Sequence, residues 1–338
     1  MATTDNLPLV VEPYPQISPK AYEHPADRAA TAALKSVPML ETVVRKLVEY
    51  RYERALRQLY LGNSVKVSER QLPELWTSFA GVCKILDMPT SYGLYVYASP
   101  MGNAHTIGSR DPMVIVDSSL LAQLGPGEQR GVLAHELGHI LSDHVLYMTA
   151  LDILLRAGSS LPVMVGIPLR AVRAVLLEWF RAAELSADRA SVLAVRDPRI
   201  VCRTLMVATS GVPAEKLNLD AFMAQAMEYD NWEAKSDRVQ RFFLEIGATH
   251  SFAVRRVSEV MRWVQSGEYD RIARGEYVRR GEERPVREEA GDAVEFYRER
   301  FRAFFRELSD HVTGLGSQFD DASQRVADWV RGRSASRD

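Results

Sequence analysis

His135-Glu136-Leu137-Gly138-His139 lies inside an apolar stretch with helical spacing that begins near Gly127. Residues four apart fall on one face of an α-helix, so His135 and His139 can hold one metal ion between them. Glu136 follows the first histidine and can reach a water molecule on that metal. This is the H-E-x-x-H pattern, in which two histidines bind zinc and the glutamate acts as a general base. A third protein ligand is needed before the pattern predicts a zinc site.

A pair of acidic residues further along the chain can supply that ligand. The run from Leu169 to Asp197 contains no proline and favours one long helix, on which Glu184 and Asp188 share a face. A catalytic zinc site has three protein ligands, and two histidines with one glutamate form a common set. We therefore expect Glu184 to bind the metal and Asp188 to orient one ligating histidine, His135 by preference. The alternative is a solvated helix face whose carboxylates pair with neighbouring arginines.

The segments Leu133–Ile140 and Glu184–Arg189 together resemble the HtpX and CAAX-prenyl-protease-like family of zinc metallopeptidases, which are gluzincins. The similarity covers roughly residues 25–265. It implies one zinc ion per chain, held by the two histidines of the motif and Glu184. It also implies that Glu136 activates the attacking water, and that the substrate is a protein or a peptide.

A period-two pattern upstream of the motif predicts a small antiparallel sheet, the layout on which zincins build their cleft. The expected strands are 94–97, 104–108 and 113–116. We choose 103–108 as the edge strand, which can pair with an extended substrate. Gly102-Asn103-Ala104 also resembles the Asn-Ala edge strand of the family, so Asn103 and Ala104 are expected to bind substrate. An ordinary meander that caps the helix is the alternative.

A second shorter match concerns the opposite wall of the cleft. Thr249-His250 and Arg256-Val257 resemble the T-H-P…R-I segment of the family, with Ser251 in place of the proline. From this match we expect His250 to donate a hydrogen bond to the oxyanion and Arg256 to anchor Glu184 or Asp188. The same position would let His250 move onto the zinc when substrate is absent. A simple helix cap is its alternative role.

The chain as a whole reads as an α+β protein that is mostly helical and zincin-like. Residues 1–25 contain five prolines and are expected to form an irregular arm, 26–280 the metallopeptidase domain, and 281–338 an amphipathic helical extension. Beside the motif helix that starts near Gly127, the expected helices are 26–35, 38–60, 71–87, 145–156, 169–196, 198–209, 219–229, 233–247 and 252–266.

The composition gives no reason to expect a nucleic-acid partner. The formal net charge is −2, with 46% hydrophobic and 25% charged residues, as in ordinary soluble globular proteins. Cys83 and Cys202 are far apart on apolar patterns, so we expect buried free thiols in a reducing compartment, the cytoplasm. The segments 145–155 and 161–180 are too short or too charged to span a membrane, although peripheral contact with one is compatible with the sequence.

The other histidines have weaker signals. His144 is five residues after His139 and points away from the zinc face, so a buried, hydrogen-bonded structural role is expected. His24 and His311 have no partners in sequence and are expected to be exposed, and His105 stays undecided on the edge strand.

These expectations combine into a zinc metalloendopeptidase in which Glu136 takes a proton from the water and passes it to the leaving amine. The alternative is a self-plugged or catalytically idle zinc fold that serves as a protein-binding or chaperone-like module. Glu136 favours the enzyme, because a purely structural zinc site closes all four positions with protein ligands and has no use for a base.

Overall fold

The computed structural model describes residues 12–35, 53–157, 169–233 and 251–283, together with Glu41, Val44, Arg45 and Val48. The expected helix at 233–247 lies almost wholly outside the described residues, as do most of 38–52, His250, His311 and the C-terminal extension after residue 283.

Most described helices agree with the sequence prediction because proline and glycine mark their ends. Pro73, Pro126 and Pro198 occupy the first turn of their helices, where the missing N–H costs nothing, and Gly211 ends one helix in the left-handed conformation with φ 66°. The α-helices are α1 (Pro25–Lys35), α3 (Glu53–Asn63), α4 (Pro73–Ile85), α5 (Ser118–Leu121), α6 (Pro126–Leu141), α7 (Val145–Ala157), α8 (Leu169–Val195), α9 (Pro198–Ser210), α10 (Leu219–Glu233), α12 (Ala253–Gln265) and α13 (Glu268–Ala273). In the described ranges there are also two short 3-10 helices, η1 (Pro19–Ala21) and η4 (Ala214–Lys216).

The sheet has four strands in the order β1-β2-β4-β3 and corrects one expectation. The strands are β1 (Ser64–Lys66), β2 (Gly93–Tyr97), β3 (Ala104–Ile107) and β4 (Met113–Asp117). β1 pairs with β2 and β3 with β4 in antiparallel fashion, but β2 and β4 are parallel, so the sheet is mixed rather than antiparallel. After β2 the chain skips the neighbouring position and forms β3 at the edge of the sheet. It then turns back through a hairpin, so that β4 fills the skipped position and runs parallel to β2. β3 lies at the edge of the sheet, as expected.

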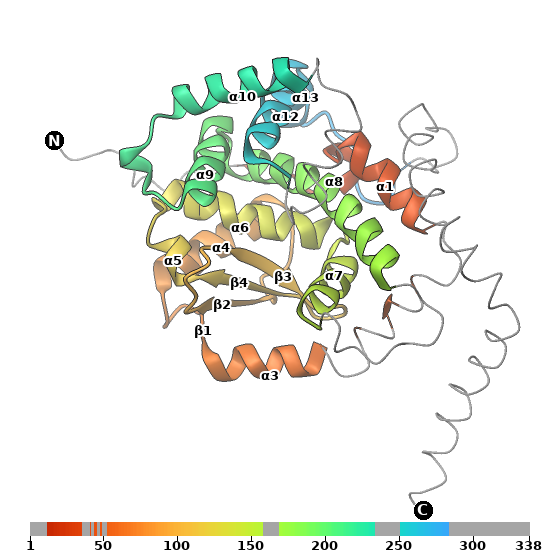
Figure 1. The fold of residues 1–338 in the computed structure, drawn as a ribbon, viewed down its shortest axis with the longest axis vertical. Coiled ribbons are helices and arrows are strands. Elements are labelled where there is room, and N and C mark those ends of the chain that lie inside the picture. Colours follow the sequence, from red (N-terminus) through yellow and green to blue (C-terminus); the bar gives the residue numbers. More distant parts are fainter. Residues whose placement is uncertain are drawn as a thin grey trace, which may run out of the picture.

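Helix α6 lies between the sheet and a group of helices that includes α8, α9 and α12, whereas α3 lies on the other side of the sheet (Figure 1). One face of the sheet packs against α6 and α4, while Tyr60 of α3 lies with Tyr95 and Ile115 in a small cluster on the other face. α8 crosses α6 very closely at Gly138, where an added Cβ would lie 2.7 Å from the Cβ of Ala190. This spacing brings the motif helix and the long helix into direct backbone proximity.

The N-terminal segment before α1 is part of the core. Tyr14, Ile17 and Tyr22 are buried in the main hydrophobic cluster, and Ile17 forms an isolated β-bridge with Arg279. α1 then packs along α8, where its alanines and Leu34 join a second cluster with α7. Consequently the two ends of the described chain are held next to each other.

Two further expectations can be compared with the described part of the chain. Cys83 and Cys202 are both buried and free. Within the described ranges no helix is both long and apolar enough to cross a membrane.

Candidate metal centre

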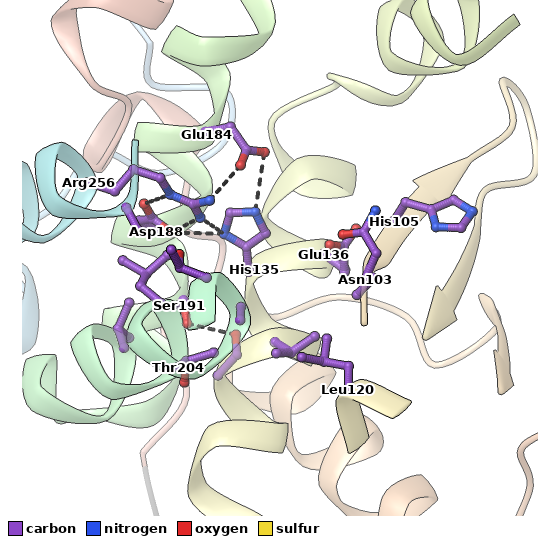
Figure 2. A pocket seen from close by; sticks show the side chains of 18 of the residues that line it. Asn103, His105, Leu120, His135, Glu136, Glu184, Asp188, Ser191, Thr204 and Arg256 are labelled. Atoms are coloured by element: carbon purple, nitrogen blue, oxygen red, sulfur yellow. Dashed lines mark hydrogen bonds and ion pairs between the residues drawn. The ribbon is translucent and has the colours of Figure 1, made fainter. Parts of the chain in front are cut away.

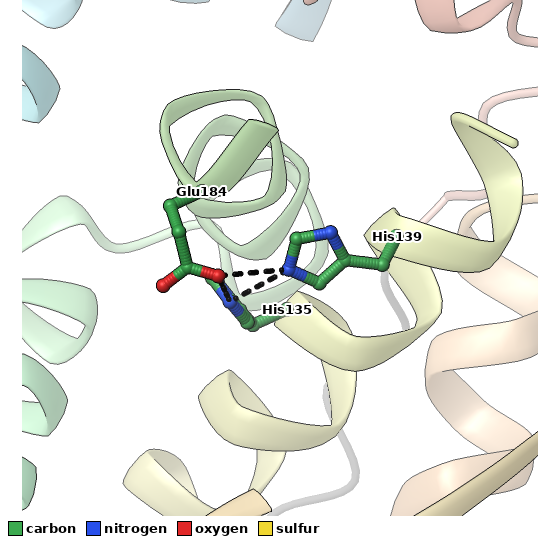
Figure 3. Close-up of side chains that lie close together, drawn as sticks. All are labelled: His135, His139 and Glu184. Atoms are coloured by element: carbon green, nitrogen blue, oxygen red, sulfur yellow. Dashed lines mark hydrogen bonds and ion pairs between the residues drawn. The ribbon is translucent and has the colours of Figure 1, made fainter. Parts of the chain in front are cut away.

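Two helices bring three potential metal ligands together. His135 and His139 come from consecutive turns of α6, and Glu184 comes from α8 where the two helices cross (Figure 3). The two histidine Nε2 atoms are 3.2 Å apart, and Oε1 of Glu184 lies 3.1 Å from Nε2 of His139 and 3.5 Å from Nε2 of His135. The ligand atoms all lie within 4.8 Å of one another, and the side chains of His139 and Glu184 are almost fully buried. Their donor set of two imidazoles and one carboxylate is one that zinc accepts.

An arginine holds the carboxylates of this cluster in place (Figure 2). The guanidinium of Arg256, on α12, donates two hydrogen bonds to Asp188, with lengths of 2.6 and 2.7 Å, and a third of 2.7 Å to Oε2 of Glu184. Asp188 also lies 3.1 Å from Nδ1 of His135. Burial alone would raise the pKa of Asp188, but the charge and hydrogen bonds of Arg256, together with the contact with His135, outweigh burial and lower it. Asp188 therefore remains a carboxylate that can accept a hydrogen bond from the Nδ1–H group of His135.

The two histidines differ in their electrostatic surroundings. Burial would lower the pKa of His135, but its hydrogen bonds with Asp188 and Glu184 outweigh burial and raise that pKa. Burial dominates for His139 and lowers its pKa, because its second ring nitrogen faces another imidazole rather than a carboxylate.

Glu136 is held by the edge strand. Its carboxylate is buried, and Oε2 accepts a hydrogen bond of 2.7 Å from the hydroxyl of Thr106 on β3. Nothing in the sequence singles out Thr106 except its place on a period-two strand, and that pattern does not show which side chain across the cleft it meets. The bond fixes the glutamate on the side of α6 that faces the sheet.

Two cavities lie along β3. The first, of about 320 Å³, is lined by the three potential ligands, Glu136, Asn103 and Ala104. The second, of about 360 Å³, lies between β3, α3 and α7, and shares Asn103 and His105 with the first. Asn103 is anchored through its backbone, since its N–H donates to Asp117 Oδ2 over 2.9 Å and its carbonyl accepts from the N–H of Asp117 over 2.8 Å. The residues expected to bind substrate thus line a hollow that reaches the candidate metal centre.

His105, left undecided by the sequence, points away from the cluster (Figure 2). Its Nε2 lies 2.9 Å from the hydroxyl of Tyr60 on α3, and burial lowers its pKa. The side chain of His105 therefore lies on the face of the sheet opposite the potential ligands.

His144 and His24 both have partners. His144 is buried, with its Nδ1 3.0 Å from Nδ1 of His139 and its Nε2 3.0 Å from a carboxylate oxygen of Asp27 in α1. The expectation that His24 is exposed is wrong: its side chain is only 14% exposed, and Nε2 lies 3.3 Å from Glu259. Because α1 packs against α8, Asp27 lies beside His144, and His24, just before α1, lies beside Glu259. Spacing along the chain cannot show either contact.

Ser251, which stands where the resembled family has proline, has a clear local role. Its side chain is buried and its hydroxyl donates a 3.1 Å hydrogen bond to the carbonyl of Arg181 on α8. This bond fixes the approach to α12, the helix that carries Arg256.

The fold and the site define a class: a zincin-like scaffold with an H-E-x-x-H helix, a glutamate from a second helix and an edge strand beside them. The sequence pattern of Peptidase family M48 matches residues 68–264, and the chain belongs to this family. The plastoglobule-localized metallopeptidase 48 (chloroplastic) of Arabidopsis thaliana is 33% identical over 259 residues, which are 73% of each chain. No solved structure matches the chain. The resemblance drawn from the two motif segments is thus confirmed, and the protein is a metallopeptidase that acts on proteins or peptides.

Proposed function

We propose that the protein is a zinc endopeptidase that binds one zinc ion through His135, His139 and Glu184. The observation that carries this proposal is the convergence of the three ligand atoms from α6 and α8, with Glu136 lining the same cavity. Bound zinc would polarise the scissile carbonyl and make a water molecule acidic enough to be deprotonated near neutral pH.

Glu136 is proposed as the general base and acid. It takes the proton of the attacking water and later delivers it to the leaving amine, so that no net proton is gained or lost by the enzyme. The hydroxyl of Thr106 donates a hydrogen bond to Oε2 of Glu136, and Glu136 lines the same cavity as the three potential ligands. Because the carboxylate is buried beside the potential ligands, it is positioned for a short transfer rather than for exchange with bulk water.

The substrate is proposed to bind in an extended form along β3. Ala104 is paired with Val116 on one side, and among the described strands none covers the other side of β3. Asn103 and Ala104 would contact the substrate backbone there, in the hollow that leads to the candidate metal centre. His250 is proposed to donate a hydrogen bond to the oxyanion. Arg256 would keep Glu184 and Asp188 in place.

The decisive experiment compares Glu136→Gln with Glu128→Gln. Glu128 lies on the same helix α6, is also buried, and pairs with Arg203 away from the cluster, so it is a matched control. Purified Glu136→Gln should keep about one zinc per chain and lose cleavage of an unfolded protein such as casein by about 10²-fold or more, since a positioned base contributes 10²–10⁴-fold. Glu128→Gln should keep both zinc and activity.

The same measurement addresses the idle-fold alternative. A Glu136→Gln protein that cleaves casein at the wild-type rate would contradict the mechanism. Wild-type protein that binds zinc but cleaves neither casein nor a peptide library would favour a protein-binding module.

The cytoplasm is the proposed location, on the ground that both cysteines are buried free thiols, which suits a reducing compartment. Subcellular fractionation with antibody detection tests this location. Recovery with membranes or lipid bodies would contradict it and would point to peripheral attachment.

A further inference from the structure

His139 has a chain of contacts behind it that the proposed zinc site does not itself require. Its Nε2 faces Glu184, and its Nδ1 on the opposite side of the ring lies 3.0 Å from Nδ1 of His144. Nε2 of His144 then lies 3.0 Å from Oδ2 of Asp27. Asp27 also accepts hydrogen bonds from Ser186 over 2.6 Å and from Thr31 over 3.0 Å.

The protons in this chain can be arranged in only one way when His139 binds a metal. Metal binding through Nε2 leaves the proton of a neutral His139 on Nδ1, so this nitrogen must donate to His144. Nδ1 of His144 must then accept, which places the proton of a neutral His144 on Nε2, where it donates to Asp27. Asp27 needs no proton, because all of its described contacts are with donors. Every hydrogen bond of the chain thus points away from the metal site and toward one carboxylate.

The members of this chain are shielded from water. Asp27 is fully buried, and the side chains of His139 and His144 are 1% and 2% exposed. Buried hydrogen bonds that include a charged acceptor hold their partners more firmly than exposed ones. The arrangement therefore constrains both the tautomer and the orientation of the His139 ring.

We propose that His144 and Asp27 are positioning residues that hold His139 ready for the metal, as Asp188 holds His135. This inference rests on the proposed zinc site. It assigns a part in that site to α1, although Asp27 lies outside the matched segment 68–264. The two histidine ligands would then each be oriented by a carboxylate, directly for His135 and through one imidazole for His139.

The competing explanation is a purely structural network that holds α1 against α8. Both explanations predict a loss of stability when Asp27 or His144 is changed, so stability cannot separate them. Zinc affinity of the folded protein can, because only a positioning role transmits the change to His139.

The experiment measures the zinc Kd of folded variants by competition with a fluorescent chelator at fixed pH. His144→Leu should weaken zinc binding roughly 10- to 100-fold, the usual cost of losing such a partner. His144→Gln should recover part of this loss, because its amide can accept from His139 and donate to Asp27. Thr149→Val is the control, since it removes buried hydrogen bonds of α7 near His144 without touching the chain, and it should leave the Kd unchanged.

A double-mutant comparison tests the order of the chain. Asp27→Asn should weaken zinc binding in the wild-type background but add little in the His144→Leu background, because the connection to His139 is already broken there. An unchanged zinc Kd in folded His144→Leu and His144→Gln, or an equal effect of Asp27→Asn in both backgrounds, would overturn the inference. Failure of the wild-type protein to bind zinc would instead overturn the proposed function itself.

Discussion

At the scale of single residues, the candidate site contains buried carboxylates whose negative charge is balanced by an arginine. Glu184 and Asp188 are both almost fully buried on α8, one turn apart, and Arg256 contacts both. Without the arginine, two neighbouring carboxylates would be left in a desolvated place, which is costly. The guanidinium therefore keeps one carboxylate facing the metal position and the other facing His135.

This arrangement leads to a prediction for Asp188. Asp188→Asn should weaken zinc binding roughly 10- to 100-fold, because an amide is a poorer acceptor for the Nδ1–H group of His135. The amide also cannot accept both hydrogen bonds that the Arg256 guanidinium donates to the carboxylate. Competition with a chelator measures this affinity. Asp220→Asn, which changes an exposed ion pair with Arg199, serves as the control. Zinc affinities that do not differ between the two variants would leave Asp188 as an ordinary ion-pair partner.

At the scale of elements, the crossing of α6 and α8 sets the distance between the histidines and Glu184. Gly138 lies between the two histidines of the motif and meets Ala187 and Ala190 of α8. A helix normally disfavours glycine, which costs about 0.5–1 kcal/mol relative to alanine, so the close approach is what gives glycine its use here. Small residues on both helices let the ligands of one reach those of the other.

Gly138→Ala should accordingly destabilise the protein and reduce its zinc content. The added Cβ would lie 2.7 Å from that of Ala190 and 3.3 Å from the Cα of Ala187, so the helices must separate, at a cost of about 1–3 kcal/mol. Gly81→Ala on α4 is the matched control, because its Cβ would meet nothing within 4 Å and should be neutral or stabilising. Urea unfolding and metal analysis of both variants check this. Equal stabilities would show that α6 and α8 tolerate a wider spacing.

The sequence predicts the helices well, but it does not predict which strands and side chains become neighbours. Helices such as α6, α8 and α9 could be predicted to within a few residues, because proline marks their ends and apolar periodicity marks their faces. The potential ligands could be found because four-residue spacing is a local property of a helix. The parallel pairing of β2 and β4 could not, because period-two alternation identifies strands without naming their neighbours. Thr106 and Asp27 were missed because their contacts arise only when distant elements pack.

At the scale of the whole molecule, the buried polar network around Asp27 makes the stability of the folded protein depend on pH. Burial would raise the pKa of Asp27, but its contacts with His144, Ser186 and Thr31 outweigh burial and lower the pKa from 3.8 to about 2. A carboxylate with a depressed pKa in the folded state contributes stability that is present above the unfolded value of 3.8. This contribution is lost as the pH falls toward 2.

Acid unfolding of the metal-free protein should therefore depend on Asp27. The shift corresponds to about 2 kcal/mol, so Asp27→Asn should lose about that much stability at pH 7 and should lose less than the wild type between pH 4 and pH 2. Asp152→Asn, which alters an ion pair with the exposed Arg156, should follow the wild-type curve. Urea unfolding at several pH values gives both curves. Parallel curves for wild type and Asp27→Asn would contradict the assignment.

The ion pairs of Arg256 with Glu184 and Asp188 also have a consequence for folding during synthesis, because the arginine is added to the chain after both carboxylates. A chain is made from its N-terminus, and domains fold as their parts leave the ribosome. Asp27 emerges first, the motif helix and α8 follow, and the arginine that balances their carboxylates comes only with α12. A nascent chain that stops before α12 has the histidines and the glutamate but lacks the cation that holds them in register. The carboxylates of the cluster can therefore be paired with Arg256 only after α12 has been synthesised.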